Sequence, residues 1–257
     1  MLRTVASVLV TSARTAGAVA LTAVLTVCGN HSLDPNETAF HVRSLNLVKE
    51  SPTLEIDVDD TTLFTAGYGR ATRFTAGDPG QHTLSFSAIL PPDLRDDDET
   101  ATRVSGASAY TFLAGTEYTV VAYGTMDDLR TFIIEGLDQR EHVEDDKLVL
   151  QFTHASPDTP AVDVYVTAVK AGITSRYYVD TLSLTETSDP LELSLIRSED
   201  DSAENSALSA DVVIELMVAD TNELLYRSDA ITFAERNRVM MAIASNLELL
   251  PVSDAAL

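Results

Sequence analysis

Two stretches that share one pattern decide the predicted fold: Ser51-Pro-Thr-Leu-Glu-Ile-Asp-Val58 and Thr159-Pro-Ala-Val-Asp-Val-Tyr-Val166. Each begins with a hydroxyl residue and a proline and continues with apolar residues at alternate positions. A period of two is typical of a β-strand with one buried face, and proline suits a strand entrance because it fixes φ and donates no hydrogen bond. The stretches therefore predict equivalent strands, 108 positions apart (159 less 51), in two related halves.

Other alternating stretches have the same character. They lie at 40–45, 83–87, 118–123 and 129–134. We expect each to form a half-buried strand, because short strands separated by Gly, Pro, Asp and Ser clusters are typical of β-sandwiches and barrels. The sequence therefore predicts an all-β protein with antiparallel sandwich domains.

A second pair of matching stretches supports two tandem repeats. Residues 108–114 and 118–121 are echoed, in the same order, by 229–234 and 239–242. The polar, charged run at 138–147 has nothing to bury, so we expect it to be a linker between repeat 1 at 38–137 and repeat 2 at 148–252, with a tail at 253–257. The irregular acidic stretches 90–102 and 197–209 are expected to be loops.

The N-terminus has the pattern of an export signal. Arg3 and Arg14 precede an apolar run at 16–27, which is too short to span a bilayer, and Cys28, the only cysteine, follows it. The sequence Leu25-Thr-Val-Cys28 resembles a bacterial lipobox, which predicts cleavage of residues 1–27, lipidation of Cys28 and a flexible leader at 28–37. An ordinary signal peptide with an incidental cysteine, or an uncleaved anchor, is the alternative. With one cysteine no intrachain disulfide can form.

The charge balance limits the partners. The chain has 17 Lys and Arg against 40 Asp and Glu, a formal net charge of −23 at pH 7. Contact with the phosphates of nucleic acid would be repulsive, so nucleic acid is excluded as a partner, and anionic membrane surfaces are equally poor. Membrane attachment is therefore expected only through a lipid on Cys28.

The stretch Phe152-Thr-His-Ala-Ser-Pro-Asp-Thr-Pro-Ala-Val-Asp-Val-Tyr-Val166 resembles the opening motif His-Ala-Ser-Pro-Asp-x-Pro-x-Val-Asp-Val-Tyr of domain of unknown function 4397 (DUF4397). Ala114-Gly-Thr-Glu-Tyr-Thr-Val-Val121 is similar to a later segment of that family, and the resemblance extends over most of 38–252. Repeat 1 has Arg43-Ser-Leu-Asn-Leu-Val-Lys-Glu50 in place of the opening motif. The resemblance implies tandem immunoglobulin-like β-sandwiches on exported proteins and lipoproteins, without an established activity.

His154, Ser156 and Asp158 have the residue types of a catalytic triad. Neighbours in a strand that runs into a turn cannot form the hydrogen-bond chain that a triad assembles from distant segments, so we predict no catalytic residues. We interpret the group as a structural motif in which Ser156 and Asp158 bond backbone amides around a proline. The motif consists of His154, Ser156, Pro157, Asp158, Pro160 and Asp163.

No metal site or cofactor is predicted. The acidic runs lack the alternating spacing and turn glycine of a calcium loop, and the five histidines are scattered. Gly67-Tyr-Gly69 is expected to be a turn with an exposed aromatic that could stack on a sugar, whereas Tyr177 and Tyr178 are expected to divide between core and surface.

These patterns favour a non-enzymatic lipoprotein of the cell envelope, on the periplasmic side or outer surface. Its expected role is adhesion, scaffolding or ligand display, with an envelope protein or a glycan as a partner. The alternative is a periplasmic binding module for Ca²⁺ or glycans, accessory to an enzyme.

Overall fold

The computed structural model describes residues 38–89, 101–103, 108–136, 143–144, 146–170, 173–197, 208–234 and 237–253. The predicted signal segment, Cys28 and the leader lie outside the described residues, as do most of the predicted linker and loops and the tail beyond residue 253. These described residues belong to one compact unit.

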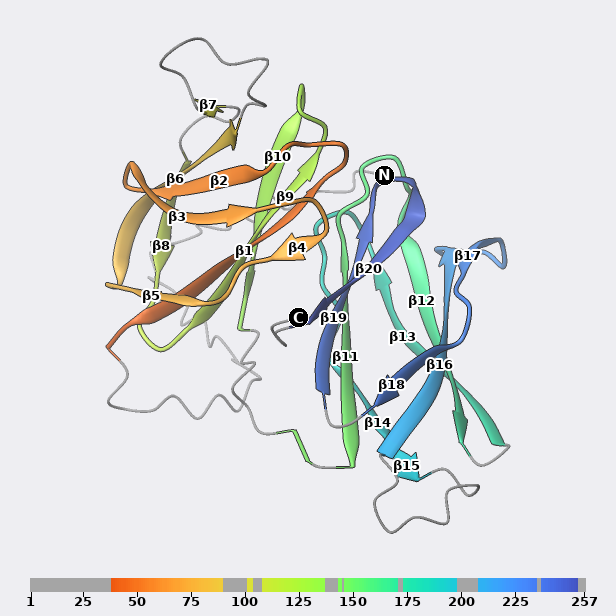
Figure 1. Ribbon diagram of the computed structural model, residues 1–257. Coiled ribbons are helices and arrows are strands. Elements are labelled where there is room, and N and C mark those ends of the chain that lie inside the picture. The colour runs from red at the N-terminus through yellow and green to blue at the C-terminus, as the bar shows by residue number, and fades with distance from the viewer. Residues whose placement is uncertain are drawn as a thin grey trace, which may run out of the picture. The chain divides into compact units, whose positions relative to one another are not determined.

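The first half of the chain forms a two-sheet sandwich (Figure 1). One sheet has the order β10-β9-β1-β4, with β5 also on β1: Leu129–Glu135, Glu117–Gly124, Phe40–Val48, Arg70–Ala71 and Thr75–Gly77. The other has the order β3-β2-β6-β7, with β8 also on β6: Thr61–Ala66, Leu54–Val58, Gly80–Ile89, Ala101–Arg103 and Ser108–Phe112.

The second half forms another two-sheet sandwich (Figure 1). One sheet has the order β14-β11-β19-β20: Leu191–Ser194, Lys147–His154, Asn237–Ala244 and Glu248–Ser253. The other has the order β13-β12-β16-β15, with β17 and β18 also on β16: Ile173–Leu182, Val162–Lys170, Leu208–Val218, Ile196–Arg197, Leu224–Arg227 and Ile231–Ala234. The prediction of an all-β sandwich protein is confirmed.

The two sandwiches use one pairing scheme. In the first, β1 lies parallel to β9, β2 is antiparallel to β3 and β6, and β6 pairs with β8. In the second, β11 lies parallel to β19, β12 is antiparallel to β13 and β16, and β16 pairs with β18. Even a register irregularity recurs, at Ile56/Asp57 and, 108 positions later, at Val164/Tyr165. The common origin of the two halves stays a prediction, and the parallel pair in each was not predicted.

Strand β9 is buried on both faces, since all eight of its residues are buried. Its inward residues, such as Tyr118 and Val120, join the core between the sheets of the first sandwich. On the opposite face of the strand, Val121 and Tyr123 belong to a separate core. The prediction of a half-buried strand at 118–123 was therefore wrong, because the outer face of this sheet also has an apolar partner.

That separate cluster, the shared core, contains residues of both sandwiches. Its buried members are Leu45, Leu47, Val121, Tyr123 and Ile134 from the first and Ala155, Met240, Ala242, Ala244 and Val252 from the second. Burial of apolar surface contributes about 25 cal/mol per Å², so this layer couples the stabilities of the two sandwiches.

The turn between β3 and β4 also contacts the second sandwich. The Tyr68 hydroxyl donates a hydrogen bond of 2.6 Å to Glu248 Oε2 on β20. Gly69, at φ 68°, lies so close to Leu250 that an added Cβ would be 3.5 Å from its Cδ1. Burial, together with the hydrogen bond to Glu248, raises the pKa of Tyr68 above its usual range. Tyr68 is half-buried, so the prediction of an exposed aromatic on this turn was wrong.

Candidate functional site

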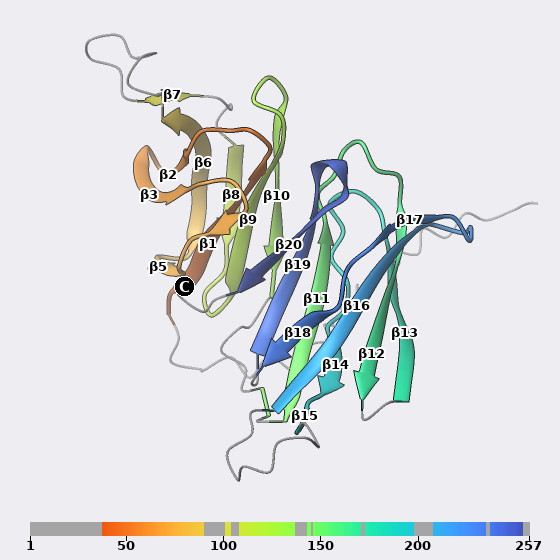
Figure 2. The same ribbon diagram turned by 45° about the vertical axis from the view of Figure 1, so that its right-hand side comes forward.

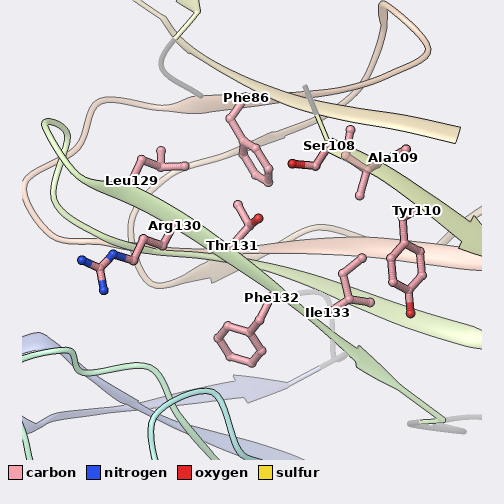
Figure 3. A pocket seen from close by; sticks show the side chains of 10 residues that line it. Phe86, Ser108, Ala109, Tyr110, Leu129, Arg130, Thr131, Phe132 and Ile133 are labelled. Atoms are coloured by element: carbon pink, nitrogen blue, oxygen red, sulfur yellow. The ribbon is translucent and has the colours of Figure 1, made fainter. Parts of the chain in front are cut away.

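A cleft of about 570 Å³ opens in the first sandwich between β8 and β10, the edge strands of its two sheets (Figure 3). Its lining comes from β6, β8 and β10: Leu84, Phe86, Ser108, Ala109, Tyr110, Leu129, Arg130, Thr131, Phe132 and Ile133. Among the described strands β8 pairs only with β6, and β10 only with β9. The cleft therefore runs along one side of the core of this sandwich, and the core residues Leu84 and Phe86 stay buried beneath it.

The period of two along β10 divides its side chains between the cleft and the opposite face. Figure 3 shows Thr131 pointing toward Phe86 across the cleft, whereas Phe132 points the other way. Phe132 packs against the shared core, with its ring centroid 5.5 Å from that of Tyr123. One strand thus carries part of the cleft on one face and part of the shared core on the other.

The cleft combines an apolar floor with hydroxyl groups at its margin. Leu84 and Phe86 belong to the core of the sandwich, while Ser108 and Thr131 supply hydroxyls. The Tyr110 hydroxyl donates to Glu135 Oε1 at 2.9 Å. Burial and this hydrogen bond raise the pKa of Tyr110 above its usual range, so its hydroxyl stays protonated. An apolar floor with a few polar groups is the usual lining of a ligand site.

Arg130, on β10, borders the cleft and forms an ion pair at the surface. Its Nη2 lies 2.6 Å from Asp128 Oδ2, and both side chains are at least half exposed. An exposed ion pair of this kind contributes little to stability, about 0–1 kcal/mol. Because Arg130 has the same parity on β10 as Phe132, its guanidinium lies on the face of the strand that is turned away from the cleft (Figure 3).

His154, predicted as part of a structural motif, is fully buried at the end of β11. Its Nδ1 accepts the Ser156 N–H at 3.2 Å, so Nε2 carries the proton and donates to the Pro160 carbonyl at 3.1 Å. Burial lowers the pKa of His154, against the opposing hydrogen bond to Pro160. Because both ring nitrogens bond to the main chain, the imidazole is placed to shape the turn.

The rest of the motif divides between the turn and the following strand. The Ser156 hydroxyl lies 2.7 Å from that of Thr159 and not on a backbone amide, while Asp158 is exposed. Pro157 is half-buried and Pro160 is exposed. Asp163, on β12, accepts a short hydrogen bond from Thr181 on β13. The structure therefore does not bring His154, Ser156 and Asp158 into one hydrogen-bonded chain.

Asn46 occupies the position of His154 in the first sandwich, 108 positions earlier, and the sequence analysis missed it. Its Oδ1 accepts the Val48 N–H at 3.0 Å, the same two-residue step that His154 makes to Ser156. Its Nδ2 donates to the Ala66 carbonyl at 3.0 Å. The repeat offset alone could have identified this residue.

The outer face of β12 carries a network of aromatic and charged residues. The Arg176 guanidinium lies 3.9 Å from the ring centroid of Tyr165, and its Nε donates to Glu215 Oε2 at 3.0 Å. Tyr178 lies beside Tyr165, with ring centroids 5.4 Å apart. Tyr177 and Tyr178 are 39% and 55% exposed, so the prediction that one would lie in the core was wrong; β13 is an edge strand.

The described residues contain no group of three or more His, Cys, Asp or Glu that could hold a metal ion. Likewise, in this part of the chain the one helical segment is the 3₁₀ turn Ser245–Leu247, and none has the length and apolar character needed to cross a membrane. Cys28, the predicted lipidation site, lies outside the described residues.

Comparison with known proteins gives one family match. The model of the family described as "Domain of unknown function (DUF4397)" matches residues 40–165, from the first residue of β1 into β12. Residues 166–252, for which the resemblance was also expected, lie outside this match. No curated protein matches the chain.

Solved structures give only weak similarity. A leucine-rich repeat protein from Bacteroides thetaiotaomicron is 11% identical, with a TM-score of 0.21 over 84% of this chain and 27% of its own. A proposed adhesin from Bacteroides ovatus is 8% identical, with a TM-score of 0.24 over 85% of this chain and 96% of its own. The chain thus spans about a quarter of the first structure, and neither similarity supports a functional assignment.

Proposed function

The chain belongs, through residues 40–165, to the DUF4397 family of domains of unknown function, and from this premise we propose that it is a non-enzymatic envelope lipoprotein that displays a peptide-binding cleft. The observation that carries the proposal is the cleft between β8 and β10. Its volume of about 570 Å³ lies within the usual range of ligand sites, roughly 300–1,000 Å³.

The ligand class follows from the two strands that border the cleft. An edge strand has a row of backbone N–H and C=O groups without a partner in its own sheet, and an extended peptide can pair with that row. Alternate side chains of such a peptide would face the apolar floor formed by Leu84, Phe86 and Ile133. An extended segment of another envelope protein, with apolar residues at alternate positions, fits this arrangement.

Blocking the cleft should abolish peptide binding. Peptides selected on the wild-type protein from a displayed random library are expected to bind Ser108→Trp at least tenfold more weakly, since indole would fill the space between the strands. Tenfold corresponds to about 1.4 kcal/mol. Ser108 lines the cleft, pairs with Leu84 of its floor and is exposed, so the substitution leaves the packed core intact. Binding is measured by fluorescence anisotropy with labelled peptides.

The matched control is Ala114→Trp, which places the same side chain at another exposed position of this sandwich, outside the cleft lining. It should bind the selected peptides as the wild type does. Equal binding by both variants and the wild type would show that the peptides do not use the cleft. Failure to enrich any peptide would contradict the ligand class.

Lipidation at Cys28 is tested separately in a bacterial host. Cells that express the chain and are fed labelled palmitate should incorporate label into the wild-type protein. The Cys28→Ala variant should carry no label, because the lipid is attached through the cysteine sulfur. The readout is the labelled band on a gel. Label that persists in the variant would refute the lipid anchor and leave the proposal for the cleft untouched.

A further inference from the structure

Exposed apolar residues gather on the β12–β13 hairpin of the second sandwich. Within the part of the chain that the structure describes, seven large hydrophobic residues are exposed, and four of them lie there: Val169, Ile173, Tyr177 and Tyr178, at 41%, 67%, 39% and 55%. Exposed apolar residues that occur singly are normal, whereas a group of them marks an interaction site.

Strand β13 is a long edge, and its residues 173–178 lack the features that usually protect edges. It has ten residues and, among the described strands, pairs only with β12 (Figure 2). Natural edges are protected by lysine, proline, bulges or short length. Ile173–Leu182 contains no lysine, proline or glycine, and its register irregularity lies beyond Tyr178. By contrast, the edge strand β20 carries Pro251.

The charge of this edge suits a second copy of the same chain. Residues 164–179 contain Lys170 and Arg176 and no carboxylate, although Asp and Glu outnumber Lys and Arg by 40 to 17 in the whole chain. Arg176 is moreover paired with Glu215. Two strongly acidic chains repel one another, so they approach at least cost where both surfaces lack carboxylates.

We propose that two copies of the chain associate through antiparallel pairing of their β13 strands about a twofold axis at Ser175. Such an axis is perpendicular to the sheet, so odd-numbered residues of one copy lie opposite odd-numbered residues of the other. The two sheets then join into one, with the same face of each copy on the same side. Ile173 of each copy then lies opposite Tyr177 of the other, an apolar cross-strand pair formed twice. An axis at Arg176 would instead oppose two like charges.

A hollow beside Tyr177 supports this register. It measures about 130 Å³ and lies between β13 and β14, with Ser175, Tyr177 and Leu193 in its lining. The lining also includes Glu192, whose carboxylate is paired with Lys147 at 2.8 Å. Ile173 of the second copy, opposite Tyr177, would cover this hollow. The pairing therefore covers Ile173 and Tyr177, the two exposed apolar residues of β13 that lie on the same face of the strand as the hollow.

A cysteine placed on the axis tests the register directly. Opposed residues of an antiparallel pair have Cα atoms roughly 4.5–5.5 Å apart, within the span of a disulfide. In the full chain carrying Cys28→Ser, Ser175→Cys should form a disulfide-linked dimer under mild oxidation. In Thr174→Cys the new cysteine lies opposite Arg176 of the second copy and not opposite the other new cysteine, so the yield of cross-linked dimer should be at least tenfold lower. The readout is non-reducing gel electrophoresis. Equal cross-linking of both variants would overturn the register.

Sedimentation tests the association itself. The wild-type chain should show a dimer that strengthens as salt rises from about 0.05 to 0.5 M, because salt screens the repulsion between the copies. Ile173→Lys with Tyr177→Lys should weaken dimerisation at least tenfold, while Leu224→Lys, an equally exposed site on β17, should not. A chain that stays monomeric at every salt concentration, or a dimer that resists the double substitution, would overturn the proposal. Neither result depends on peptide binding by the cleft.

Discussion

Replacing His154 with alanine is expected to lower the free energy of unfolding by about 3 kcal/mol, measured by urea denaturation followed by circular dichroism. The imidazole is fully buried and bonds the Ser156 amide and the Pro160 carbonyl. Its removal leaves two backbone groups of the turn without their partner and creates a cavity. An unsatisfied buried group such as the Ser156 amide costs about 1–3 kcal/mol, and the cavity adds to that.

Asn46 provides the matched substitution. It accepts the amide two residues ahead in the first sandwich, as His154 does in the second. His154→Asn is therefore expected to retain the bond to Ser156 and lose about half as much stability as the alanine variant. If both variants were equally destabilised, or neither were, the imidazole would have no role in ordering the turn.

The pH dependence of stability provides a second readout for His154. Burial lowers the pKa of the folded imidazole below its ordinary value of 6.5, so the unfolded chain binds more protons than the folded chain as pH falls below 6.5. The contribution of His154 to the free energy of unfolding is thus fully present above about pH 6.5 and decreases below it. This part of the slope should disappear in His154→Asn.

His82 should behave in the opposite direction and serves as the control. Burial, the largest effect, lowers its pKa, but hydrogen bonds to Asp59 and to the Asp78 carbonyl outweigh it and raise the pKa overall. The contribution of His82 to the free energy of unfolding is fully present below pH 6.5, the ordinary pKa, and decreases as pH rises through the raised pKa of the folded state. His82→Asn should therefore leave intact the loss of stability at acidic pH that comes from His154.

Introducing a carboxylate into the shared core is expected to have the other large effect. Ala242 is fully buried among residues of both sandwiches. Ala242→Asp places an unpaired charge there, which costs about 3–5 kcal/mol. For 150–250 residues, 1 kcal/mol shifts the midpoint by roughly 2–4 °C, so the melting temperature should fall by about 10 °C in scanning calorimetry.

The shape of the melting curve adds information to its midpoint. The wild-type chain is expected to unfold in one transition, because the shared core couples the two sandwiches, and Ala242→Asp should separate it into two. Ala76→Glu, at an exposed position of β5, is the control and should change neither feature. A wild-type curve with two transitions, or an unchanged midpoint in Ala242→Asp, would show that the shared core does not couple the sandwiches.

Local periodicity predicted the strands well and their surroundings less well. The stretches at 54–58, 118–123 and 129–134 all lie in strands, because a period of two reflects the strand backbone itself. Burial of the second face of 118–123 depends on residues such as Met240, more than a hundred positions away, which no local pattern can reveal. For the same reason the sequence did not show which strands would pair in parallel.

The candidate site illustrates the same limit. Residues 108–114 were recognised only as a repeat marker, although Ser108, Ala109 and Tyr110 line the cleft. A cleft between two sheet edges needs the topology to bring those edges together, and β8 and β10 are ordinary strands in sequence. The motif around His154, by contrast, was visible because its function is local to one turn.

The parallel pairing of β1 with β9 determines how the first sandwich responds to mechanical force. Tension between the N-terminal end of β1 and the C-terminal end of β9 pulls the two strands along their length in opposite directions. The ladder from His41–Glu117 to Val48–Gly124 then shares the load, whereas an antiparallel pair pulled at adjacent ends would unzip one bond at a time. Under the proposed function, an anchor ahead of β1 and a peptide held on β10, which pairs with β9, would apply tension across this ladder.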